Sequence, residues 1–210
     1  MARGFYVVTT EDRSGELAKF LKWLLKFNKY PVFVAVAEDR LDAHRKKTIV
    51  GALSPFESTV MLDTDMLING DLTPLFEIAE QGKIGLLDEG LNYYSTKVYN
   101  SGVVAIRKDI AIELSKVWLP EYEQHIQNRM NRIHGAFDQF VLNRILGENK
   151  GRFAVHALDP AFNWILKFHT PEQESLDFEK IKVFHFLHDD DKKHPADRRA
   201  FASFRIFNEG

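Results

Sequence analysis

Short apolar runs alternate with amphipathic segments over the first half of this chain. The runs that predict buried strands are Phe5–Thr10, Pro31–Val36, Val60–Leu62 and Ile84–Leu87. Helices are predicted between them, from an N-cap at Ser14, over residues 41–53 and over residues 73–80. The alternation predicts an α/β fold in which a mostly parallel, mixed central sheet of Rossmann-like type is flanked by helices.

The second half of the chain is less regular. A strand is predicted over residues 99–106, followed by a helix from Asp109 that is interrupted at Leu119-Pro120. Further helices are expected over residues 121–132 and from Phe137 to a cap at Gly147. The last predicted strand covers residues 181–186. No repeat or clear linker divides the chain, so we expect one domain over residues 1–210.

The most informative segment is Ser58–Glu77, because two acids in it follow a buried strand directly. Asp63 and Asp65 are separated by Thr64, and alternate residues on a strand face the same side. Carboxylates beside so many apolar residues are costly to desolvate unless an opposite charge compensates them. A hard divalent cation supplies that charge. The alternative interpretation is a strand end with two solvated aspartates.

Composition narrows the class of protein. The chain has no cysteine, which excludes disulfides, thiolate metal sites and cysteine nucleophiles. Its net charge of −2 gives no overall nucleic-acid footprint. Neither a signal peptide nor a stretch of membrane-spanning length is recognisable. We therefore expect a cytoplasmic protein, of a bacterial cell or a virus-infected host cell, rather than a secreted one.

Four other segments carry candidate chemistry, and each also has an ordinary structural explanation. Asn100-Ser101-Gly102 begins an apolar strand, where a glycine lets a ligand approach the backbone. Asp138-Gln139 opens a helix, where an acid is also a normal dipole partner. His185 lies in an apolar strand and could be a metal ligand or a buried structural histidine. Lys192-Lys193 could neutralise a leaving diphosphate or belong to a solvated loop.

Taken together, these segments resemble the metal-dependent GT-A glycosyltransferases, in particular the family 8 group that includes glycogenin and bacterial lipopolysaccharide galactosyltransferases. The segments that match, in the order of the family, are VMLDTDMLINGDLTPLF, VYNSGVVAI, FDQFVLN, LDPAFNW and VFHFLH. The resemblance implies a UDP-sugar donor, Mn²⁺ or Mg²⁺, and transfer to an acceptor hydroxyl with retention of anomeric configuration. It also implies that residues 1–106 bind the nucleotide sugar and that residues 107–210 supply the acceptor side and closing elements.

The same resemblance assigns expected roles to single residues. Asp63, Asp65 and His185 correspond to the metal ligands, and Thr64 lies between the two acids. Lys47, or its neighbour Lys46, corresponds to the basic residue that helps to hold the donor. The residues expected to hold the donor sugar near its anomeric carbon are Asn100, Gly102, Asp138 and Gln139. Those expected at the nucleoside are Thr9, Thr10 and Asp12.

Several points stay open on the sequence alone. The family's glycine after the metal histidine is missing, the register of Lys192 and Lys193 is displaced, and His188 is a rival ligand. No nucleophile is assigned, and the acceptor can be a glycan, a protein, a lipid head group or a modified nucleobase. The rival functions are a haloacid-dehalogenase-like phosphatase, which also uses D-x-D after a strand, and a non-catalytic nucleotide-sugar binder on the same scaffold.

Overall fold

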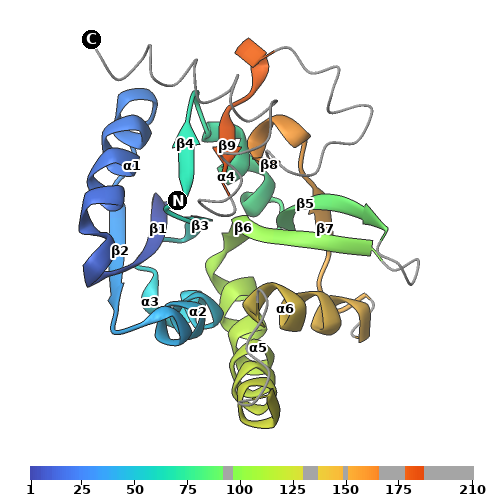
Figure 1. Cartoon of the computed structure of the whole chain (residues 1–210). Helices are drawn as coiled ribbons and strands as arrows, with labels where there is room; N and C mark the ends of the chain where they lie inside the picture. The colour runs from blue at the N-terminus through green and yellow to red at the C-terminus, as the bar shows by residue number, and fades with distance from the viewer. Residues whose placement is uncertain (92–96, 130–136, 149–150, 166–177, 187–210) are drawn as a thin grey trace.

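A mixed six-stranded sheet forms the centre of the molecule in the computed structural model, which describes residues 1–91, 97–129, 137–148, 151–165 and 178–186 (Figure 1). The strand order is β2-β1-β3-β6-β5-β7. The strands are β1 (Arg3–Thr10), β2 (Val32–Ala37), β3 (Ser58–Leu62), β5 (Ile84–Leu91), β6 (Lys97–Arg107) and β7 (Val155–Ala157). β1 is parallel to β2 and β3, and β5 is parallel to β7, whereas β6 is antiparallel to both of its neighbours.

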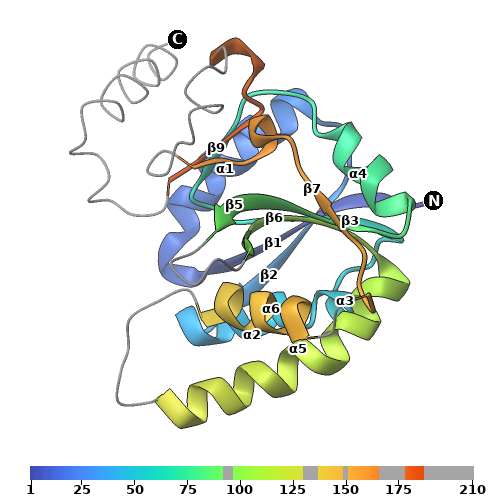
Figure 2. The ribbon, with the colours of Figure 1, turned by 90° about the vertical axis from the view of Figure 1, so that its right-hand side faces the viewer.

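Helices and a second, smaller sheet cover the two faces of the central sheet (Figure 2). One face carries α2 (Arg40–Thr48), α3 (Val50–Leu53), α5 (Lys108–Arg129) and α6 (Phe137–Glu148). The other face carries α1 (Ser14–Phe27), α4 (Thr73–Glu80) and the small sheet. That small sheet has the order β4-β9-β8, formed by β4 (Met66–Ile68), β9 (Val183–His185) and β8 (Trp164–Ile165). The short 3₁₀ segments are η1 (Glu11–Arg13), η2 (Pro160–Phe162) and η3 (Phe178–Lys180).

Alternation along the strands produces two separate apolar cores. Tyr6 and Met61 face α5 and α6, where Trp118 is fully buried. Their neighbours Phe5 and Val60 face the opposite way, toward α1 and α4. Because successive side chains of a strand point to opposite faces, nearly continuous apolar strands indicate a sheet that is covered on both sides. The central strands β1, β3 and β6 therefore have little freedom to shift.

The structure differs from the sequence-based expectations in several places. α5 continues through Pro120 to Arg129, so the predicted interruption at Leu119-Pro120 is wrong. Ser14 is the first residue of α1 rather than its N-cap. The expected helix over residues 41–53 divides at Ile49 into α2 and α3. Within the described ranges, no helix combines the length and the apolar composition that crossing a membrane requires.

Candidate active site

The two acids lie on a short segment that joins the central sheet to the small sheet. The backbone N–H of Asp63 donates to Gly102 of β6 at 3.0 Å, and Asp65 accepts from the N–H of Phe186 at 2.8 Å. Met66 then begins β4, which pairs with β9 so that Met66 is opposite His185. Backbone hydrogen bonds thus bring together segments that are far apart in the sequence. As a result, Asp63 and Asp65 lie close to His185, as predicted.

Asp63, Asp65 and His185 form a group suited to a divalent cation. One ligand atom from each lies within 4.8 Å of the others, and His185 Nε2 is 3.5 Å from Asp65 Oδ1. His185 is buried, while both acids are partly exposed. Carboxylates are suitable ligands for both Mn²⁺ and Mg²⁺. The imidazole favours Mn²⁺, which is the softer of the two ions. The donor set therefore fits the metal that the resemblance implies.

Lys47 provides the positive charge of the site. Its Nζ lies 3.0 Å from Asp63 Oδ1 and 2.8 Å from Asp138 Oδ2, and only 6% of the residue is exposed. Lys46, the other candidate, pairs with Asp42 on the same helix instead. The structure thus places Lys47, rather than Lys46, beside Asp63 and Asp138.

Burial and charge move the pKa values of these carboxyl groups in different directions. Burial raises the pKa of Asp63, against the effect of Lys47. Burial also acts to raise the pKa of Asp65, but the His185 imidazole, when it is protonated, and Lys47 hold that pKa below its usual value. For Asp138, burial is outweighed by Lys47 and His44, which hold its pKa well below the usual range. Asp138 is therefore a fixed anion at neutral pH.

A network of amides occupies the centre of the site. Asn100 Nδ2 donates to Glu89 Oε1 at 2.8 Å and to Gln139 Oε1 at 3.2 Å. Gln139 Oε1 also accepts the backbone N–H of Ser101 at 3.2 Å, and the Ser101 hydroxyl donates to Asp138 at 3.0 Å. Asn100 and Gln139 are thus in contact, and Ser101 joins them to Asp138.

The start of α6 is held against β6 and α5 by side chains of α6 and α5. Asn143 accepts the N–H of Tyr99 at 2.7 Å and donates to its carbonyl at 2.8 Å. Trp118 Nε1 donates to the carbonyl of Asp138 at 3.2 Å. These contacts fix the first turn of α6, from which Asp138 and Gln139 reach the site.

Gly102 lies against His185 and Met66. A Cβ at this position would lie 2.3 Å from Cε1 of His185 and 2.8 Å from Cε of Met66. The missing side chain makes room for the imidazole, so this glycine allows the close approach of a residue of the chain itself.

The residues expected at the nucleoside lie at the same edge of the sheet. Thr9 and Thr10 end β1, which pairs with β3, and Asp12 follows in η1, exposed to solvent. Thr64 lies between the two acids, partly buried. Lys192, its neighbour Lys193 and His188 fall outside the described residues.

Sequence reasoning missed two residues that complete the site. Glu89 bonds to both Asn100 and Gln139, and burial raises its pKa. It lies two residues after the predicted strand Ile84–Leu87, so its position near the end of that strand was an available signal. Asn163, fully buried, bonds to Asn100 and His185. It belongs to the segment LDPAFNW, which matched the family pattern without a role.

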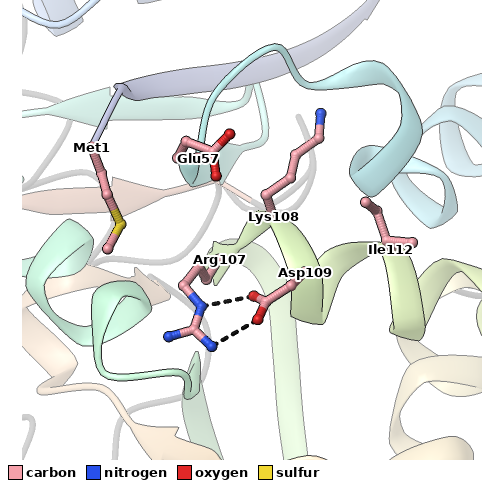
Figure 3. Close-up of a pocket in the computed structure, with 6 residues that line it drawn as sticks. All are labelled: Met1, Glu57, Arg107, Lys108, Asp109 and Ile112. Carbon is pink, nitrogen blue, oxygen red and sulfur yellow. Dashed lines mark hydrogen bonds and ion pairs between the residues drawn. The ribbon is translucent and has the colours of Figure 1, made fainter.

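A surface pocket lies at the opposite end of β6 and is lined by Met1, Glu57, Arg107, Lys108, Asp109 and Ile112 (Figure 3). Its main polar feature is the ion pair of Arg107 with Asp109, in which Arg107 Nε lies 2.7 Å from Asp109 Oδ1. β6 carries Asn100 and Gly102 near its start and Arg107 at its end, so this pocket is separate from the acids and His185.

No family model and no curated protein matches this chain. Solved structures do match it. The apo form of the glycosyltransferase GlyE of Streptococcus pneumoniae TIGR4 aligns with 93% of this chain and 57% of its own, with a TM-score of 0.65 and 14% identity. This chain therefore spans just over half the length of the GlyE chain.

Two other glycosyltransferase structures match over nearly their full length. One is involved in glycosylation of the major capsid of PBCV-1, with a TM-score of 0.63, 16% identity and coverage of 95% of this chain and 98% of that one. The other is the galactosyltransferase LgtC in complex with donor and acceptor sugar analogs, with a TM-score of 0.62, 14% identity and 94% coverage of each chain. The chain thus has the GT-A fold of these glycosyltransferases, as its resemblance to family 8 predicted.

Proposed function

We propose that this protein is a metal-dependent glycosyltransferase that moves a sugar from a UDP-sugar to an acceptor hydroxyl with retention of anomeric configuration. The observation that carries the proposal is the convergence of Asp63, Asp65 and His185, with one ligand atom from each within 4.8 Å of the others. This group lies at the carboxyl end of β3, the edge where α/β sheets bind their ligands. The UDP donor and the retaining outcome rest on the family resemblance.

Asp63, Asp65 and His185 would hold Mn²⁺ or Mg²⁺. When bound, the ion would act as a Lewis acid that offsets the negative charge developing on the leaving diphosphate. Lys47 pairs with Asp63 and holds Asp138 charged and in place. Thr9, Thr10 and Asp12 are proposed to contact the nucleoside, and Lys192 the diphosphate.

Asn100, Gln139, Gly102 and Asp138 are proposed to position the donor sugar. The hydrogen bonds among Asn100, Gln139 and Glu89 hold the amides in fixed orientations, which favours a single sugar pose. Asp138 Oδ2 already accepts from Lys47 and Ser101, so we give it a positioning role and assign no nucleophile.

The acceptor side is proposed to lie mainly in residues 107–210. The described site already draws on both parts of the chain, because Lys47, Asp63 and Asn100 come from residues 1–106 and Asp138 and His185 from the rest. A glycan, a protein, a lipid head group or a modified nucleobase would each offer a suitable hydroxyl.

Slow donor hydrolysis tests the proposal without knowledge of the acceptor. A panel of UDP-sugars is incubated with the protein and Mn²⁺, and free UDP is measured. We expect one or a few donors to be hydrolysed, the reaction to stop with EDTA, and Asp65→Asn to slow it by about 100-fold or more. The matched control is Asp109→Asn, which removes an exposed carboxylate at the far end of β6.

The same assay separates the rival functions. Binding of a UDP-sugar without turnover, measured by calorimetry, would indicate a non-catalytic binder. Phosphate release from p-nitrophenyl phosphate without UDP-sugar hydrolysis would indicate a phosphatase. NMR of the first sugar released assigns its anomeric configuration and thus tests retention.

A further inference from the structure

A buried chain of hydrogen bonds runs from the backbone of β6 to the imidazole of His185. The N–H of Gly102 donates to Asn100 Oδ1 at 2.8 Å. Asn163 Nδ2 lies 2.8 Å from the same oxygen, and Asn163 Oδ1 lies 3.0 Å from His185 Nδ1. Asn100, Asn163 and His185 are each at most 2% exposed, so water cannot readily replace these partners.

The direction of every bond in this chain follows from its first member. A backbone N–H can only donate, so the atom of Asn100 that faces Gly102 must be its oxygen. The atom of Asn163 that meets that oxygen must then be its NH₂ group, which leaves the Asn163 oxygen facing the imidazole. An amide oxygen can only accept, so the neighbouring nitrogen of His185 must carry a proton.

We propose that Asn163 is a positioning residue that holds the proton of His185 on Nδ1 and thereby turns the unprotonated Nε2 toward Asp65. Only an unprotonated ring nitrogen can ligate a metal, so this arrangement prepares His185 before any ion arrives. The link to metal binding rests on the proposed function, whereas the position of the proton is a property of the chain alone.

The surroundings of His185 make this restraint necessary. Asp65 Oδ1 lies 3.5 Å from Nε2 and is an acceptor that favours a proton on that nitrogen. Asn163 opposes this preference from the other side of the ring. The Asn100 amide whose oxygen directs Asn163 also donates, through Nδ2, to Glu89 and Gln139 at the proposed sugar position, so one backbone N–H orients both groups.

NMR of protein labelled with ¹⁵N-histidine tests the proton position directly. Two-bond ¹H–¹⁵N correlation spectra distinguish the two neutral tautomers, and the His185 signal is assigned by its loss in His185→Gln. Metal-free protein at about pH 8.5, above the ordinary range of histidine pKa values, is used. We expect the Nδ1–H tautomer in the wild type. The Nε2–H tautomer there would overturn the proposal.

Two substitutions separate positioning from simple packing. Asn163→Leu has a similar shape but no acceptor, and we expect the proton to move to Nε2. Asn163→Asp keeps an acceptor for Nδ1–H, and we expect the Nδ1–H tautomer to persist. An unchanged tautomer in Asn163→Leu would overturn the proposal. Asn28→Leu is the matched control, because it removes another buried asparagine, bonded to Leu24 and Gly70, and should leave His185 unchanged.

Calorimetry with Mn²⁺ then tests the consequence for the metal. Loss of an outer partner of a metal-bound histidine typically weakens metal binding about 10–100-fold, and we expect Asn163→Leu to fall in that range. If the wild type binds no Mn²⁺ but shows the Nδ1–H tautomer, the metal-dependent function fails and the role of Asn163 in placing the proton stands. If the wild type binds Mn²⁺ but its metal-free His185 ring is the Nε2–H tautomer, the role of Asn163 fails and the metal-dependent function stands.

Discussion

At the scale of single residues, the site depends on one buried lysine shared between two carboxylates. Lys47 Nζ is 3.0 Å from Asp63 and 2.8 Å from Asp138. Burial acts to lower the pKa of Lys47, but Asp138 and Asp63 together raise it well above its usual value. Removing one partner of a buried ion pair costs about 3–5 kcal/mol, because the remaining charge stays desolvated and unpaired.

Lys47→Met is therefore expected to lower the free energy of unfolding by about 3–5 kcal/mol at pH 7 in metal-free protein. In the wild type, Asp138 stabilises the folded state because its pKa is lower there than in the unfolded chain, where it is about 3.9. This contribution is complete above a pH of about 3.9 and is lost as the pH falls further. In the variant burial dominates, the pKa of Asp138 rises above the unfolded value, and stability recovers on acidification. Urea unfolding at pH 7 and near pH 4 should show the difference shrinking in acid.

Lys46→Met is the control for this experiment. Lys46 pairs with Asp42 across one turn of α2, a type of pair that contributes about 0.3–0.5 kcal/mol. The loss of unfolding free energy in Lys46→Met should be no larger than about 0.3–0.5 kcal/mol at both pH values. A loss for Lys47→Met that does not depend on pH would mean that packing of the lysine chain, rather than its charge, stabilises the site.

Gly102 is the residue whose size most directly controls His185. In Gly102→Ala the added Cβ would meet Cε1 of the imidazole at 2.3 Å, and β6 is too tightly paired to move away. We expect a loss of about 1–3 kcal/mol in unfolding free energy, and Mn²⁺ affinity lowered because the ring is displaced. Urea unfolding and Mn²⁺ calorimetry measure the two effects. Gly15→Ala, where nothing lies within 4 Å, should be neutral or stabilising.

An unchanged Mn²⁺ affinity in Gly102→Ala would show that the imidazole can move without losing the metal. A glycine would then not be needed at this position for metal binding.

The sequence allowed prediction of the residues whose chemistry is unusual for their surroundings. Asp63 and Asp65 beside an apolar strand and a histidine within another strand indicated a metal site, and the structure brings them together. Glu89 and Asn163 were missed because single polar residues near strand ends are common. Their role depends on distances to Asn100, which no spacing along the chain reveals.

At the scale of secondary structure elements, the antiparallel direction of β6 is what completes the site. A parallel strand in this place would put its carboxyl end beside Asp63. Because β6 runs the other way, its beginning, with Asn100 and Gly102, lies there instead. Apolar alternation predicted the strand but carries no information on its direction, so the sheet's order and this reversal could not be derived from the pattern.

The continuity of α5 through Pro120 shows tertiary packing overriding local preference. Trp118 and Tyr122, on either side of Pro120, are fully buried, and each side chain donates to a backbone carbonyl, of Asp138 and Leu41 respectively. These contacts hold both halves of the helix in line. The cost of a proline in a helix interior, about 3 kcal/mol relative to alanine, is offset rather than avoided.

Pro120→Ala should therefore raise the free energy of unfolding, by about 1–3 kcal/mol. The substitution restores a backbone N–H to an exposed helix position without changing a core residue. Urea unfolding measures the change, and Lys116→Ala on the exposed face of the same helix serves as control. A loss of stability in Pro120→Ala would instead indicate that a bend at Pro120 is needed to seat Trp118 and Tyr122.

At the scale of the whole molecule, the proposed metal would connect the two sheets. Asp63 follows β3 of the central sheet, whereas His185 belongs to β9 of the small sheet. The backbone already joins the sheets at this point, through Asp63 to β6 and through Asp65 to the residue after β9. Residues from distant parts of the sequence would thus bind one metal ion, and metal binding would depend on an intact fold.

Mn²⁺ is accordingly expected to stabilise the folded protein by mass action, by about 2.7 kcal/mol at a free concentration 100 times the dissociation constant. Asp65→Asn and His185→Gln should lose this increment, while Asp109→Asn should retain it. Because burial raises the pKa of Asp63, protons compete with the metal as the pH falls, and the increment should shrink on acidification. Hydrogen exchange should show the added protection in β4 and β9, the strands that carry His185 and its partner. If Mn²⁺ raised the unfolding free energy of the wild type and of Asp65→Asn equally, the ion would bind elsewhere and Asp65 would not be a metal ligand.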